Sequence, residues 1–127
     1  MSDKKPVILC IDDDSDFLDS LQIIIESGGY GFERANSAEE GLRRSREVKP
    51  DLIVVDLMME EVDAGVNFVK DIKARGDKTP IYMLSSVGDN LNISADYTQL
   101  GLSGLFQKPI NPDTLLTTLN RRLKAKA

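Results

Sequence analysis

The chain of 127 residues is long enough for one domain with a sizeable core, and its 41% hydrophobic and 29% charged residues are typical of a globular protein rather than a disordered one. A net charge of −5 argues against general binding to nucleic acid or to an anionic membrane surface. The sequence has no histidine, which excludes histidine-dependent nucleophiles and histidine metal sites, so any catalysis must use carboxylates, hydroxyls, lysine or a bound ion.

Residues 6–11 (PVILCI) form a continuous apolar run of strand length. The run is too short for a signal peptide or a membrane span, so no membrane association is expected. It contains Cys10, the only cysteine, which cannot form an internal disulfide and is predicted to be a small buried side chain. A reducing, cytoplasmic location is therefore expected.

The next three elements are predicted from the spacing of apolar residues and from residues that begin or end helices. Residues 17–27 repeat apolar side chains at helical spacing, and two glycines after them end this predicted helix. Residues 30–35 (YGFERA) predict a weaker strand. Ser37, three residues before Glu40, is typical of a capping box and predicts a helix over residues 38–48.

The second half of the chain continues the alternation of strands and helices. Strands are predicted at residues 51–57 (DLIVVDL), 80–85 (PIYMLS) and 104–108 (GLFQK). Between the first two, apolar residues at helical spacing mark a third helix: Val66, Phe68, Val69 and Ile72. A fourth helix within residues 88–101 has asparagines and an isoleucine near its start, which predict a short first turn.

The last predicted helix covers residues 113–123 and begins after an N-cap and a first-turn proline, Asn111 and Pro112. Five strand-then-helix units with apolar strands indicate a single α/β domain over residues 1–127, with a parallel sheet covered by helices on both faces. In such sheets the ligand site lies outside the carboxyl ends of the strands.

Polar residues stand at those strand ends. They are Asp12 and Asp13 after the first strand, Asp56 at the third, Ser85 at the fourth, and Lys108 followed by Pro109 at the fifth. Three carboxylates brought close together repel one another unless a cation joins them, and an all-oxygen ligand set favours Mg²⁺. A lysine and a hydroxyl beside that ion are what phosphoryl transfer needs.

The sequence does not match the motifs of a calcium loop, a nucleotide-binding loop or a dinucleotide site. A calcium loop beginning at Asp12 needs glycine and glutamate where the chain has Phe17 and Ile23. No phosphate-binding loop for ATP or GTP is present, and no dinucleotide fingerprint is complete. Asp14 is predicted to cap the first helix rather than to bind metal.

Four motifs, "IDD", "VVDLMM", "YMLSS" and "FQKP", stand at successive strand ends. Together they resemble the receiver domain of two-component response regulators, and the resemblance covers the chain from about Val7 to Leu123. It implies a flavodoxin-like fold, a five-stranded parallel sheet of order 2-1-3-4-5, and a chemotaxis-regulator-like phosphoprotein of a two-component system or phosphorelay.

The resemblance also implies roles for individual residues. Asp56 would be the phosphoacceptor, Ser85 would contact the phosphoryl group, and Lys108 would pair with Asp56 or its phosphate. Mg²⁺ would be held by Asp12, Asp13, Asp56 and the backbone carbonyl of Met58. The bond between Lys108 and Pro109 is expected to be cis.

Three features depart from the family pattern: Leu105, Ser86, and the loop after Asp56, which has Glu60 where proline is common and one extra residue before Gly65. In the family, an aromatic residue at position 105 usually reports the phosphorylation state by changing its rotamer. Leu105 stands there instead, so the sequence does not predict the conventional rotamer switch. Phe106 is adjacent, but strand alternation should send it to the other face of the sheet. Ser86 stands where alanine is frequent, which could narrow water access and alter the lifetime of the phosphate.

The leading hypothesis is a stand-alone receiver that takes its phosphate from a histidine kinase or phosphotransfer protein and signals through protein contacts, as a monomer or a phosphorylation-dependent dimer. It would be no enzyme beyond its own phosphorylation and dephosphorylation, and would not bind nucleic acid directly. One alternative is a small Mg²⁺-dependent aspartyl phosphatase. Another is a receiver excised from a larger DNA-binding regulator or hybrid kinase.

Overall fold

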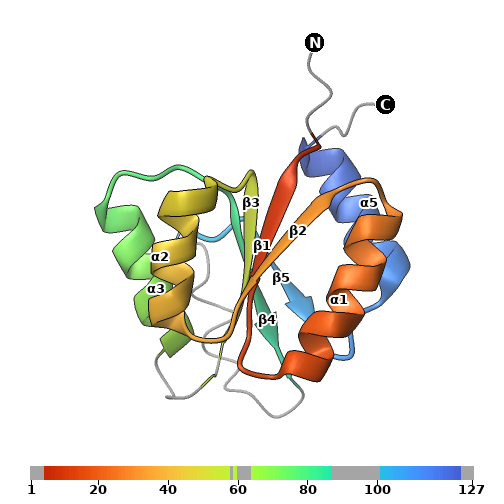
Figure 1. Ribbon diagram of the computed structural model, residues 1–127, viewed down its shortest axis with the longest axis horizontal. Coiled ribbons are helices and arrows are strands. Elements are labelled where there is room, and N and C mark those ends of the chain that lie inside the picture. Colours follow the sequence, from red (N-terminus) through yellow and green to blue (C-terminus); the bar gives the residue numbers. More distant parts are fainter. Residues whose placement is uncertain (1–4, 58, 60–63, 87–100, 124–127) are drawn as a thin grey trace.

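The computed structural model describes residues 5–57, 59, 64–86 and 101–123 (Figure 1). Its strands are β1 (Val7–Ile11), β2 (Gly31–Ala35), β3 (Leu52–Asp56), β4 (Ile81–Ser85) and β5 (Gly104–Gln107). Its helices are α1 (Ser15–Ser27), α2 (Ala38–Val48), α3 (Ala64–Ala74) and α5 (Pro112–Leu123). The expected fourth helix lies outside the described residues. None of the helices described is long and apolar enough to cross a bilayer.

The five strands form one parallel sheet in the order β2-β1-β3-β4-β5, which confirms the predicted order. β1 and β3 are central, and the register places Ile11 beside Val55. Because the strands are parallel, their carboxyl ends lie along one edge of the sheet, at the bottom of Figure 1.

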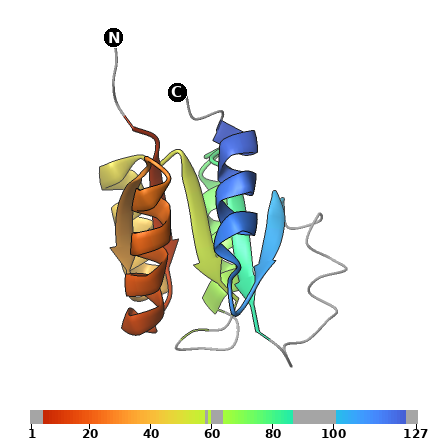
Figure 2. The same ribbon diagram turned by 90° about the vertical axis from the view of Figure 1, so that its right-hand side faces the viewer.

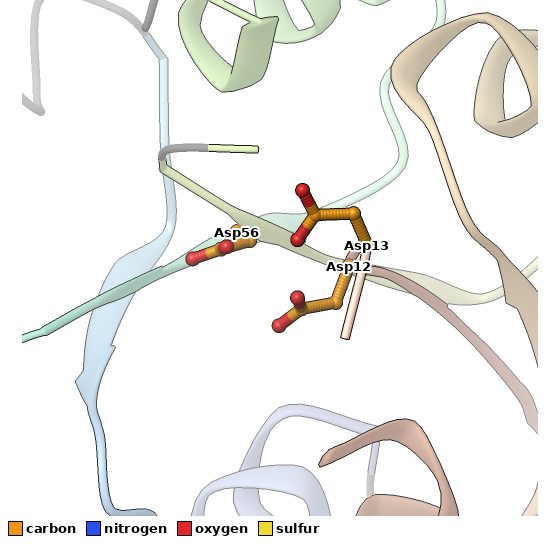
Figure 3. Close-up of side chains that lie close together, drawn as sticks. All are labelled: Asp12, Asp13 and Asp56. Carbon is orange, nitrogen blue, oxygen red and sulfur yellow. The ribbon is translucent and has the colours of Figure 1, made fainter. Parts of the chain in front are cut away.

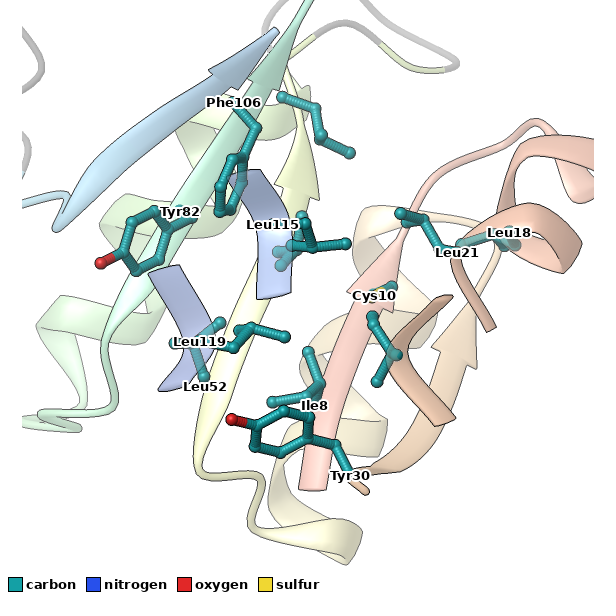
Figure 4. Close-up of a cluster of buried hydrophobic side chains, with 13 residues drawn as sticks. Ile8, Cys10, Leu18, Leu21, Tyr30, Leu52, Tyr82, Phe106, Leu115 and Leu119 are labelled. Carbon is teal, nitrogen blue, oxygen red and sulfur yellow. The ribbon is translucent and has the colours of Figure 1, made fainter. Parts of the chain in front are cut away.

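Helices cover both faces of the sheet. Figure 1 and Figure 2 show α1 and α5 on one face and α2 and α3 on the other. Each face has its own buried core, and the alternating side chains of the strands supply both. On the α1 and α5 side, the rings of Tyr82 and Phe106 stack with centroids 5.1 Å apart, next to Leu115 (Figure 4). Cys10 is fully buried in the same cluster, as predicted.

The helix boundaries follow the capping residues. Ser37 accepts a hydrogen bond from the amide of Glu40, and α2 covers the predicted residues. The Glu40 carboxylate accepts from the amide of Asn36. Asn111 accepts from the amide of Thr114 and precedes the first-turn proline of α5. These side chains satisfy amides that have no partner inside the first turn of a helix.

Candidate functional site

Asp12 and Asp13 lie directly after β1. The Asp12 amide donates to the Ala35 carbonyl of β2, which continues the sheet by one residue and brings the Asp12 side chain inside, where it is only 1% exposed. Asp13, one position later, is exposed. One Asp12 carboxylate oxygen, Oδ1, accepts from the amide of Asp14 at 3.0 Å.

Asp14 begins α1 and confirms the capping prediction. Its carboxylate accepts hydrogen bonds from the amides of Asp16 and Phe17 at 3.1 and 3.2 Å. A carboxylate at this end of a helix also lies favourably in the helix dipole. The helix therefore begins at Ser15, and the turn between β1 and α1 fixes where Asp12 and Asp13 point.

Asp56 is the last residue of β3 and is 5% exposed. Its strand, β3, is hydrogen-bonded to β1 on one side and to β4 on the other. The amide of the next residue, Leu57, donates to the Leu84 carbonyl of β4 at 2.9 Å. The sheet thus continues past Asp56, which places its carboxylate at the same edge as that of Asp12.

The carboxylates of Asp12, Asp13 and Asp56 converge, with one oxygen of each within 4.8 Å of the others (Figure 3). Asp12 Oδ2 is buried, and Lys108 is its charged neighbour among the described residues. The Lys108 ammonium offsets only one of the three carboxylate charges, and an all-oxygen set of ligands suits a hard cation such as Mg²⁺. The residues present therefore fit a divalent metal ion.

Lys108 follows β5 and extends its ammonium toward these carboxylates. Nζ lies 2.9 Å from Asp12 Oδ2 and 3.7 Å from Asp56 Oδ1, so the ammonium forms its shorter ion pair with Asp12. Burial alone would lower the pKa of Lys108, but contact with Asp12 and the charges of Asp56 and Asp14 outweigh it and raise this pKa. The ammonium is therefore charged at neutral pH.

The other predicted site residues that the structure describes lie at the ends of β4 and β5. The Lys108 amide donates to the Ser85 carbonyl at 2.8 Å, which brings the ends of β4 and β5 together. Ser85 and Ser86 are both half-buried there. The bond between Lys108 and Pro109 is cis, as predicted. Met58 lies outside the described residues.

Leu105 and Phe106 point to opposite faces of the sheet, as strand alternation predicts. Leu105 packs against the core cluster on the α2 and α3 side, whereas Phe106 belongs to the cluster on the α1 and α5 side. Phe106 therefore does not take the place of an aromatic residue at position 105.

Two residues near the site were not assigned a role from the sequence. Gly65, in the first turn of α3, lies so close to β3 that a Cβ added there would be 2.4 Å from the Asp56 carbonyl oxygen. Phe17 lies under Lys108, with Nζ 4.4 Å from the ring centroid. No local pattern in the sequence marked either contact, because both depend on how a helix packs against the strand ends.

Comparison with known proteins gives one family. The family model described as "Response regulator receiver domain" matches residues 8–120. The chain is 32% identical over 127 residues to the transcriptional regulatory protein GlrR of Escherichia coli K12, and 31% identical over 118 residues to the alkaline phosphatase synthesis transcriptional regulatory protein PhoP of Bacillus subtilis. These matches cover 100% and 93% of the chain, but only 28% and 47% of the two regulators.

Solved structures agree with this family. The chemotaxis response regulator CheY4 of Vibrio cholerae is 29% identical, with a TM-score of 0.82 over 94% of this chain and 99% of that one. A receiver domain of the Francisella response regulator 1452 is 26% identical, with a TM-score of 0.84 over 94% of this chain and 97% of that one. The parallel sheet, the acidic cluster at its edge and these similarities lead to one conclusion: the chain belongs to the response regulator receiver domains of two-component signalling.

Proposed function

We propose that Asp56 of this receiver domain is the residue that accepts the phosphoryl group. The observation that carries the proposal is the convergence of three carboxylates and one ammonium at the ends of three strands, with Asp56 in the middle strand of the sheet. Asp56 ends this strand with its carboxylate 3.7 Å from the Lys108 ammonium, and the resemblance to receiver domains assigns the nucleophilic role to this position.

The chemistry follows from these positions. A carboxylate oxygen of Asp56 attacks phosphorus in line, so that a P–O bond forms as the P–N bond of a phosphohistidine donor breaks. Lys108 offers a positive charge and N–H donors to the phosphoryl oxygens, and the Ser85 hydroxyl can donate to another of them. Asp12, Asp13, Asp56 and the Met58 carbonyl would hold Mg²⁺, which neutralises negative charge on the transferring group when bound.

The donor is proposed to be a histidine kinase or a phosphotransfer protein. The chain has no histidine, so the phosphohistidine must lie outside these 127 residues. The domain would act in the cytoplasm, signal through protein contacts, and catalyse only its own phosphorylation and dephosphorylation. Absence of phosphomonoester turnover would distinguish it from an aspartyl phosphatase.

The test is replacement of Asp56 by asparagine, which keeps the shape of the side chain and removes the nucleophile. We expect acetyl phosphate with Mg²⁺ to add one phosphoryl group to the wild-type chain and none to Asp56→Asn, as measured by intact mass spectrometry. Asp71→Asn, an exposed change on α3, is the matched control and should be phosphorylated normally. Full incorporation by Asp56→Asn would refute the assignment.

A further inference from the structure

Phe17 occupies an unusual position beside the acidic cluster. It lies in the first turn of α1, where its amide is fixed by the Asp14 carboxylate at 3.2 Å. The ring is half-buried, and the Lys108 ammonium lies over it, 4.4 Å from the centroid. This distance is well inside the range of about 6 Å for attraction between a cation and an aromatic face.

Among the described residues, the Lys108 ammonium has three close partners of two kinds. Two are carboxylates, at 2.9 Å for Asp12 and 3.7 Å for Asp56, and both carry negative charge. The third is the Phe17 ring, which attracts the cation through its π face but accepts no strong hydrogen bond and carries no charge. The ring holds the ammonium without occupying the N–H donors that a phosphoryl group needs.

The Lys108 side chain is flexible, so a contact that restrains its ammonium can aid the reaction. Four rotatable carbons let an ammonium reach many positions, and fixing it in one has an entropic cost. A phosphoryl group on Asp56 would draw donors of Lys108 away from Asp12. The ring face attracts the charge of the ammonium and does not depend on one particular N–H, so the contact can persist while these hydrogen-bond partners change.

We propose that Phe17 is a positioning residue for Lys108, holding the ammonium over the strand ends for phosphoryl transfer. The inference rests on the proposed phosphorylation of Asp56. In this role Phe17 acts through Lys108. It would assist the transfer step and the retention of a phosphoryl mimic, with no part in metal binding.

The test compares side chains that differ in the aromatic face. Phe17→Leu keeps an apolar side chain and removes the face, whereas Phe17→Tyr keeps the face. Ile24→Ala is the control, because Ile24 and Phe17 line the same hollow between α1 and residues 108–110. The contact is measured by the upfield ring-current shift of the Lys108 ε-methylene protons in NMR spectra, assigned with Lys108→Arg.

Function is measured by the rate of phosphorylation with acetyl phosphate and Mg²⁺, separated into kcat and KM, and by affinity for beryllofluoride. We expect Phe17→Leu to lose the ring-current shift and to lower kcat and beryllofluoride affinity roughly two- to fivefold, the equivalent of about 0.5–1 kcal/mol. Phe17→Tyr should restore both, and Ile24→Ala should leave both near the wild-type values.

The outcomes separate the two proposals. A wild-type chain that takes no phosphate would refute the proposed function. If the wild type is phosphorylated, a normal kcat in Phe17→Leu would overturn the positioning role alone. A loss that Phe17→Tyr fails to rescue would also overturn it, because that loss would not come from the aromatic face.

Discussion

Replacing Gly65 by alanine should impair the site without touching any charged residue. Gly65 lies in the first turn of α3, and its α-carbon faces the backbone at the end of β3. A Cβ at this position would be 2.4 Å from the Asp56 carbonyl oxygen and 2.7 Å from that of Leu57. Both neighbours are backbone atoms, so no side-chain rotation can relieve the contact.

The size of the effect follows from the required movement. An ordinary carbon contact begins near 3.4 Å, so helix and strand end must separate by about 1 Å. Overpacking of this kind costs about 1–3 kcal/mol, while alanine regains up to about 1 kcal/mol of helix propensity. We expect the free energy of unfolding to fall by about 1–2 kcal/mol. Displacement of Asp56 should slow phosphorylation roughly 10- to 100-fold.

Urea unfolding measures the first quantity, and the initial rate of phosphorylation by acetyl phosphate measures the second. Asn67→Ala is the matched control, because it adds helix propensity at an exposed position of α3 where the residue already carries a Cβ. A Gly65→Ala chain that is as stable as the wild type and phosphorylated at the same rate would refute the reasoning.

Two further predictions concern metal binding and pH. Mg²⁺ at ten times its dissociation constant should raise the free energy of unfolding by about 1.4 kcal/mol, and Asp12→Asn should largely abolish that gain in thermal unfolding. A full gain in Asp12→Asn would exclude Asp12 as a ligand. The Thr79 hydroxyl, which donates to Asp77 at 2.6 Å, is the main cause that lowers the pKa of Asp77 below 3.8. The stability from this depressed pKa is present above the unfolded pKa and is lost as pH falls through the folded pKa. Thr79→Val should therefore cost about 1 kcal/mol in urea unfolding at pH 7 and progressively less as acid protonates Asp77 in the folded chain. An equal cost at pH 7 and in acid would contradict this linkage.

Much of the fold could be predicted from local chemistry. The continuous apolar runs at residues 6–11 and 51–57 mark strands buried on both faces, and such strands occur in parallel sheets covered by helices. The side chains of Asp14, Ser37 and Asn111 begin helices as expected, because a capping oxygen satisfies amides within three residues of it.

The candidate site could be predicted because parallel strands end at a common edge. Asp12, Asp56 and Lys108 are far apart in the chain, yet each follows an apolar strand, and the alternation of strands and helices is enough to bring them together. The residues that support the site could not be predicted in the same way. The contact between Phe17 and Lys108 depends on the angle at which α1 leaves β1, and the approach of Gly65 to β3 depends on helix packing. Neither leaves a periodic pattern in the sequence.

The register of the two central strands has a consequence for how this chain tolerates insertions and deletions. Ile11 pairs with Val55, and successive side chains alternate between the two cores. One residue added or removed within Val7–Ile11 or Leu52–Asp56 would exchange the faces of that strand and also shift Asp12 or Asp56 relative to the other. Changes in chain length that preserve the domain should therefore occur in the connections, because within these strands a single such event would disrupt the packing and the acidic cluster together.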